Sequence, residues 1–248
     1  MTMKQSAVRV ARKTPGLGSL INRWQTTHSW TQPSASQHGE DMILRAVLPE
    51  ADGTYVDIGA NHPVYFSNTW SLYRRGWSGI LIDPLEEAEM LCRAQRPRDR
   101  FLKLAIGPSA GSATLFTFDY DVCSTMSERM AEAATSFGMR RKDQYEVSVV
   151  PLSSLGFSAT PDEPCLLDVD VEDLDLEVIE SNDFSTFLPR VILVEERRHP
   201  IEAATPISEK LGAEGYVLIA VTIFNSIYVH RQWLENNERF RGYFPADD

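Results

Sequence analysis

The chain has 248 residues, of which 43% are hydrophobic and 24% are charged, and it contains 14 glycines and 14 prolines. This composition excludes collagen-like, coiled-coil and wholly disordered chains. The net charge of −11 argues against nucleic-acid binding, and no apolar run approaches the roughly 18 residues that a membrane-spanning helix needs. Three widely spaced cysteines without CxxC spacing predict reduced thiols in a cytoplasmic protein with no zinc site.

The first part of the chain differs in charge from the rest. Residues 1–39 contain basic side chains and no acidic one: Lys4, Arg9, Arg12, Lys13 and Arg23. Such a segment could be a membrane-surface arm, a transit peptide or a docking segment, but a mobile tail is the interpretation that we favour. We therefore predict a basic extension over 1–35 and one domain over 36–248, with peripheral membrane contact through 1–33 as the alternative. The oligomeric state is left open.

From Thr54 onward, short β-rich runs alternate with helical stretches, which predicts βαβ units on a parallel sheet. Strands are expected at 54–58, 79–83, 101–106, 113–118, 165–169, 190–195, 216–222 and 226–230. Helices are expected at 39–48, 65–75, 85–95, 173–181 and 201–213. A helical excursion within 119–144 should form a lid or the wall of an acceptor site. The last two strands are too close for a helical crossover and should pair antiparallel, so we predict one doubly wound α/β domain.

The turn after the first expected strand is the first candidate site. Asp57 lies near the end of that strand, and Gly59, Ala60 and Asn61 follow it. An acidic residue and a glycine turn at this place are typical of α/β sheets that bind a nucleoside cofactor. The absence of a GxGxxG motif disfavours NAD and FAD. Asp83, after the second strand, is placed to accept hydrogen bonds from ribose hydroxyls, although each carboxylate could instead be a helix cap or a turn residue.

A run of alternating acidic and apolar residues forms the second candidate site. Asp168, Asp170 and Glu172 fall on one side of an extended strand. A buried central strand could not hold three unpaired carboxylates, so the later ones should emerge at the carboxyl edge of the sheet. Asp170 is our first candidate for a base that removes a hydroxyl proton, with Glu172, His199 and His62 as further candidates. Capping of the next helix is the alternative for Glu172.

Strand ends also supply a possible metal site. Asp170, Glu195 and Glu196 end neighbouring strands and could hold a hard divalent ion such as Mg²⁺. Ion pairs with Arg197 or Arg198 are the alternative that we favour. We therefore assign no metal ligand at this stage.

Several blocks of the sequence, in order, resemble the FkbM-type family of class I S-adenosylmethionine-dependent methyltransferases. The blocks are SQHGEDMIL (36–44), YVDIGANHPVYFSNTWSLYRRGWSGILIDP (55–84), LAIGPSAGSATLF (104–116), LLDVDVEDLDLEVIESNDF (166–184) and PRVILVEE (189–196). The resemblance implies a Rossmann-like sheet of seven mostly parallel strands with an antiparallel last strand. It also implies S-adenosylmethionine as the cofactor.

The resemblance further implies a set of cofactor-binding residues. Asp57, Gly59 and Asn61 would border the methionine moiety, and Asp83 would hold the ribose. The rest of the implied set is Ala105 and Ile106 near the adenine, Glu40 and Asp41 at the mouth of the site, and Ala60, Asn68 and Asp170. Two departures from the family pattern are His62-Pro63, where many relatives have a further glycine, and Asp173, which replaces the glycine of the usual DVEG block.

The predicted activity is methyl transfer to oxygen. The resemblance makes a hydroxyl of a sugar, glycan or small natural product the expected acceptor. A methyltransferase fold that is kept only for binding is the first alternative. A dinucleotide-dependent oxidoreductase is the second, and the missing GxGxxG motif counts against it.

Overall fold

The computed structural model describes residues 33–120, 123–198, 200–201 and 203–241. The basic segment 1–32 and the candidate base His199 lie outside the described residues, so the predictions made for them stay predictions. The chain divides into the units Met1–Ser34 and Ala35–Asp248, and every element below belongs to the second unit. Among the described residues, no helix is long and apolar enough to cross a lipid bilayer.

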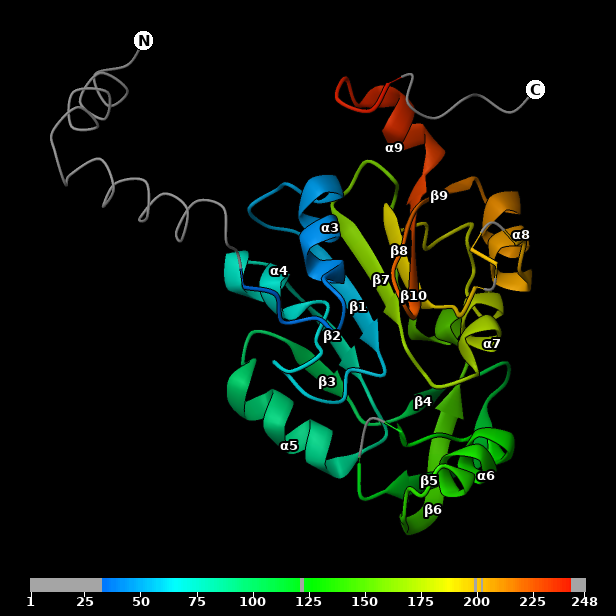
Figure 1. Cartoon of the computed structure of the whole chain (residues 1–248). Helices are drawn as coiled ribbons and strands as arrows, with labels where there is room; N and C mark the ends of the chain where they lie inside the picture. The colour runs from blue at the N-terminus through cyan, green and yellow to red at the C-terminus, as the bar shows by residue number, and fades with distance from the viewer. Residues whose placement is uncertain (1–32, 121–122, 199, 202, 242–248) are drawn as a thin grey trace, which may run out of the picture. The chain divides into compact units, whose positions relative to one another are not determined.

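A seven-stranded sheet forms the centre of this unit, in the order β3-β2-β1-β7-β8-β10-β9 (Figure 1). Its strands are β1 Thr54–Ile58, β2 Ser78–Ile82, β3 Arg100–Leu102, β7 Cys165–Val169, β8 Val191–Glu195, β9 Tyr216–Val221 and β10 Asn225–His230. Neighbours from β3 to β8 are parallel, whereas β10 runs antiparallel to both β8 and β9. The predicted fold class, the closing hairpin and the antiparallel last strand are confirmed.

Helices cover both faces of this sheet. They are α3 Glu40–Val47, α4 Trp70–Arg75, α5 Glu86–Gln95, α7 Asp175–Glu180, α8 Pro206–Ala213 and α9 Arg231–Asn236. Neighbouring residues of β7 belong to different hydrophobic clusters, one on each face of the sheet. Leu166 is in the cluster that contains Leu44 of α3 and Trp233 of α9. Leu167 is in the cluster that contains Ile179 of α7 and Leu211 of α8. Burial on both faces explains why the central strands are apolar without alternation.

A second, smaller sheet is the main difference from the predicted fold. It contains β4 Ala105–Ile106, β6 Arg141–Val150 and β5 Gly111–Phe118, in that order. The strand predicted at 101–106 is therefore two strands, one in each sheet. The basic run at 140–142 leads into β6, which pairs antiparallel with β5. The predicted helical excursion is confirmed as α6 Glu128–Ser136, whose first turn is capped by the side chain of Ser127.

The order of the strands positions the site. The chain runs outward from β1 to β3 and then returns to place β7 on the other side of β1. In open α/β sheets, ligands bind outside the carboxyl ends of the strands where the order reverses in this way. The end of β1 and the end of β7 are therefore the expected floor of a binding site.

Candidate functional site

A pocket of about 370 Å³ lies at the carboxyl ends of β1, β2, β7 and β8. Its lining includes most of the predicted site residues: Gly59, Ala60, Asn61, Asn68, Asp83, Ala105, Ile106, Asp170 and Glu172. The segment between β5 and β6 forms one wall, as predicted for the excursion, through Met126, Met130 and Phe137 among others. The chain thus brings the two candidate sites of the sequence together in one cavity.

Gly59 allows the turn after β1 to touch the end of β7. Its φ is +84°, and a Cβ at this position would lie 1.8 Å from the backbone oxygen of Asp170. The backbone N–H of Asp170 donates to the carbonyl of Ile58 at 3.0 Å, which joins the same two segments. Only glycine fits both the left-handed conformation and this close approach.

Asp83 is buried at the rim of the pocket and orders two backbone segments. One carboxylate oxygen accepts a hydrogen bond from the N–H of Asn61 at 2.9 Å, and the other accepts from the N–H of Leu85 at 2.8 Å. A carboxylate held in this way beside a narrow glycine turn fits the ribose of a nucleoside cofactor. Asp83 also serves the alternative role that the sequence left open, because it orders the turn that precedes α5.

Asp57 is buried behind the turn and lies outside the pocket lining formed by the described residues. Its carboxylate accepts a hydrogen bond from Thr69 Oγ1 and lies 3.9 Å from Nη1 of Arg96. Arg96 is itself 1% exposed, pairs with Asp99 at 2.7 Å and lies over the ring of Tyr55. The structure places Asp57 as an anchor of the turn, and its contact with the cofactor stays a prediction.

Glu40 and Asp41 begin α3 and are fully buried outside the lining. Glu40 accepts hydrogen bonds from Thr222 Oγ1 at 2.7 Å and from Asn225 Nδ2 at 3.0 Å, so it joins α3 to β10. Asp41 accepts from Ser36 Oγ at 3.1 Å. Both carboxylates are buried outside the pocket lining formed by the described residues, and their contact with the cofactor stays a prediction. Gln37 of the same block lines the pocket instead.

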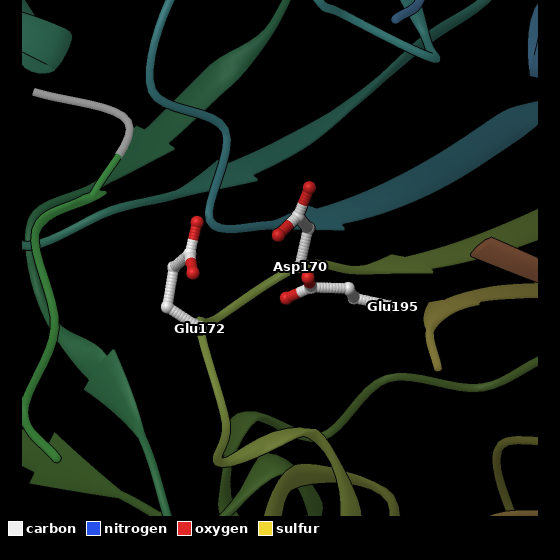
Figure 2. Close-up of side chains that lie close together, drawn as sticks. All are labelled: Asp170, Glu172 and Glu195. Atoms are coloured by element: carbon white, nitrogen blue, oxygen red, sulfur yellow. The ribbon is translucent and has the colours of Figure 1, made fainter. Parts of the chain in front are cut away.

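Three carboxylates meet on one side of the pocket. Oxygens of Asp170, Glu172 and Glu195 all lie within 4.8 Å of one another, and Figure 2 shows the three side chains converging from the ends of β7 and β8. Loss of solvent contact and the charge of Glu195 raise the pKa of Asp170 well above its usual range. The same two causes raise the pKa of Glu172 to about 7. A carboxylate with the pKa of Glu172 is suited to accept a proton near neutral pH.

The third acid that the sequence proposed beside Asp170 and Glu195 lies elsewhere. Glu196 is buried, pairs with Arg198 at 3.0 Å and accepts a hydrogen bond from the hydroxyl of Tyr228 at 2.7 Å. Successive residues of a strand point to opposite faces, so Glu195 and Glu196 cannot both face the pocket. Glu172 is the third carboxylate of the group instead of Glu196, because the chain turns sharply after β7.

Asp173 has a backbone conformation that favours glycine. Its φ is +89°, and that of Glu172 is +53°, both in the left-handed region. The side chain of Asp173 accepts a hydrogen bond from Ser127 Oγ at 3.1 Å and pairs with Arg129. Thr125 Oγ1 donates to the carbonyl of Glu172 at 3.0 Å. Asp173 therefore connects the acidic turn to α6, the wall of the pocket.

This conformation predicts the relative stability of two variants at position 173. Asp173→Ala and Asp173→Gly lose the same contacts with Ser127 and Arg129, but only glycine relieves the positive φ. We expect Asp173→Ala to be less stable than Asp173→Gly by roughly 1 kcal/mol, measured by urea unfolding. Equal stabilities, or a more stable alanine variant, would contradict the strained backbone at this position.

The family model described as the methyltransferase FkbM domain matches residues 57–243. The chain belongs to this family. The family predicted from the sequence is confirmed, and S-adenosylmethionine is the cofactor. The glycine turn and Asp83 lie within the matched region, where the pocket offers the backbone approach and the carboxylate that a nucleoside needs.

Comparison with solved structures finds low similarity. The TehB-like SAM-dependent methyltransferase of Corynebacterium glutamicum has 10% identity and a TM-score of 0.42, over 86% of this chain and 97% of that chain. The 1,6-didemethyltoxoflavin-N1-methyltransferase of Burkholderia thailandensis, solved with S-adenosylhomocysteine, has 13% identity and a TM-score of 0.38, over 92% and 89%. No curated protein sequence matches the chain. The fold assignment therefore rests on the chain's own strand order and the family match.

Proposed function

We propose that this FkbM-family methyltransferase transfers the methyl group of S-adenosylmethionine to a hydroxyl oxygen of a sugar, glycan or small natural product. The observation that carries the proposal is the group of three carboxylates in the pocket. A hydroxyl must lose its proton as it is methylated, and a base that is held beside it accelerates this loss.

We assign cofactor binding to one side of the pocket and removal of the acceptor proton to the other. When bound, S-adenosylmethionine supplies an electrophilic methyl group on sulfur. The turn at 59–61 and Asp83 would hold its nucleoside and methionine parts. Ala105 and Ile106 would lie beside the adenine ring. That methyl group would be transferred to the acceptor oxygen as the carbon–sulfur bond is broken, and a carboxylate oxygen of Asp170 or Glu172 would take up the hydroxyl proton. The products are a methyl ether and S-adenosylhomocysteine.

Exposed aromatic side chains around the pocket favour a ring-shaped acceptor such as a sugar. Tyr65, Phe66, Tyr120 and Phe137 all belong to the lining, and Phe137 is 86% exposed. Large apolar side chains that are exposed beside a cavity mark ligand-binding surfaces. Aromatic faces can stack on the C–H faces of a pyranose, while the sugar hydroxyls reach the carboxylates.

The proposal is tested with S-adenosylmethionine that carries a tritiated methyl group and a panel of glycosides, glycans, phenols and amines. We expect label in the hydroxyl compounds as a methyl ether that resists mild alkali. Phe137→Ala should raise the KM of the acceptor several-fold without a matching change in kcat. Met90→Ala, an exposed position on α5 outside the pocket, is the control and should change neither value.

Two results would contradict this proposal. Label that is transferred only to amines would exclude hydroxyl methylation as the activity. Absence of transfer to the whole panel, by protein that binds the cofactor, would favour the alternative of a fold kept for binding.

A further inference from the structure

The spacing of the three pocket carboxylates suits one cation. Asp170 and Glu172 follow β7, Glu195 ends the neighbouring strand β8, and one oxygen from each lies within 4.8 Å of the others. Oxygens on opposite sides of a Mg²⁺ ion are about 4.2 Å apart, and on opposite sides of a Ca²⁺ ion about 4.6 to 5.2 Å apart. A single divalent ion can therefore contact all three carboxylates after small side-chain movements (Figure 2).

A residue paired with Glu195 in the sheet has a buried side-chain oxygen that needs a partner. Asn225 begins β10 and stands directly opposite Glu195 in the antiparallel pair, so both side chains lie on the same face of the sheet. Both residues line the pocket. Asn225 is 2% exposed, and its Nδ2 donates to Glu40 at 3.0 Å, which fixes the orientation of the carboxamide. Its Oδ1 is buried without a hydrogen-bond partner in the part of the chain that the structure describes.

This orphaned oxygen is independent evidence for a ligand at the cluster. An unpaired buried carbonyl oxygen is costly, and native proteins rarely leave one without a donor or a cation. Carboxylate and carboxamide oxygens are the ligands that hard divalent cations prefer. The two observations therefore point to the same kind of partner.

Within the described residues, the cations of the chain do not balance the charge that the three carboxylates carry when ionised. Arg197 pairs with Oε1 of Glu195 at 3.2 Å, but its side chain is 62% exposed. In the described residues, the Asp170 carboxylate receives no hydrogen bond. One guanidinium beside three acidic groups leaves their ionised forms with an excess of negative charge, which a divalent ion would neutralise.

We infer that Asp170, Glu172, Glu195 and Asn225 form a binding site for one divalent cation of the Mg²⁺ and Mn²⁺ class. An ion there would lie in the same pocket as the acceptor, where it could bind the acceptor hydroxyl and lower the pKa of that hydroxyl. This site goes beyond the proposed function, and the binding of the ion does not depend on the identity of the acceptor.

The test is calorimetric titration of the full-length protein, freed of metals with EDTA and dialysed, with MnCl₂ and then with MgCl₂. We expect one site per chain. Asp170→Asn and Glu195→Gln should each weaken Mn²⁺ binding roughly tenfold or more. Glu87→Gln is the matched control, because it removes the same charge from an exposed position on α5 and should leave Mn²⁺ binding unchanged.

Thermal unfolding provides a second measurement that does not require turnover. Mn²⁺ should raise the unfolding temperature of the wild-type protein and of Glu87→Gln, because an ion that binds only the folded state stabilises it. The rise should be lost in Asp170→Asn, which also shows whether that variant is folded. Absence of Mn²⁺ binding at millimolar concentration, or equal binding by Asp170→Asn and Glu195→Gln, would overturn the inference.

A parallel titration with S-adenosylhomocysteine separates this inference from the proposed function. Loss of Mn²⁺ binding with retained S-adenosylhomocysteine binding would remove the metal site alone. The reverse result would leave the metal site in place and contradict cofactor binding.

Discussion

Replacing Gly59 with alanine should abolish binding of S-adenosylmethionine and S-adenosylhomocysteine. The new Cβ would lie 1.8 Å from the backbone oxygen of Asp170, in a residue whose φ is +84°. The turn after β1 would have to move away from the end of β7 by about an ångström or more, and shifts of that size can cost roughly 10²-fold in activity. We also expect Gly59→Ala to lower the free energy of unfolding by about 2 to 4 kcal/mol.

Calorimetric titration with S-adenosylhomocysteine and urea unfolding measure these two effects. Gly212→Ala is the matched control, since Gly212 lies in α8 and a Cβ there meets no atom of the chain within 4 Å. That change should leave cofactor binding unchanged and raise helix stability by up to about 1 kcal/mol. Wild-type affinity in Gly59→Ala would show that the turn is not the cofactor's backbone contact.

Asp170→Asn should lower kcat by roughly 10² to 10⁴-fold, because the variant keeps the shape of the side chain but cannot accept the hydroxyl proton. Binding of S-adenosylhomocysteine should remain within a few-fold of the wild-type value. The metal-free variant should unfold at a higher urea concentration than the wild-type protein, because the folded state disfavours the ionised form of Asp170, which is desolvated and lies within 4.8 Å of two other acidic groups.

The kcat is measured with the acceptor identified by the tritium assay, and the stability in EDTA. Glu87→Gln again controls for the loss of one negative charge. A variant that transfers methyl groups at the wild-type rate would exclude Asp170 as the base. A metal-free variant that is less stable than the wild type would show that the carboxylate has a favourable partner in the folded protein.

The sequence predicts those parts of the fold that are buried on both faces. The bounds of β1 and β7 agree with the predicted 54–58 and 165–169, because their apolar runs are closed by polar or turn residues on both sides. Parallel pairing of these two strands then places the turn at Gly59 beside Asp170. The acidic edge of the sheet follows from the cost of burying unpaired carboxylates.

The rest of the fold lacks such a signal. The first six residues of β6 are exposed, so no apolar alternation reveals this strand. This strand pairs with β5 on one side and with β4 on the other. Ala105 and Ile106 of β4 therefore belong to the smaller sheet, and both line the pocket.

The polar contacts behind the site were also missed, because they join residues far apart in the chain. In the sequence, α4, β2 and α5 lie between Asp57 and Arg96, whose side chains are in contact. Glu40 and Asn225, which are joined by a hydrogen bond, are 185 residues apart. Likewise, the choice of Glu172 over Glu196 depends on the left-handed turn after β7, where an aspartate takes the position of the family's glycine. Residue type alone gives no sign of these contacts.

We predict that the glycine turn and Asp83 bind the nucleoside of S-adenosylmethionine. The most direct measurement is calorimetric titration of the purified protein with S-adenosylmethionine and S-adenosylhomocysteine, with NAD as the control ligand and Asp83→Ala as the control variant. We expect micromolar binding of the first two ligands, loss of that binding in folded Asp83→Ala, and no binding of NAD. Failure of the folded wild-type protein to bind either ligand, or equal binding by Asp83→Ala, would contradict the account.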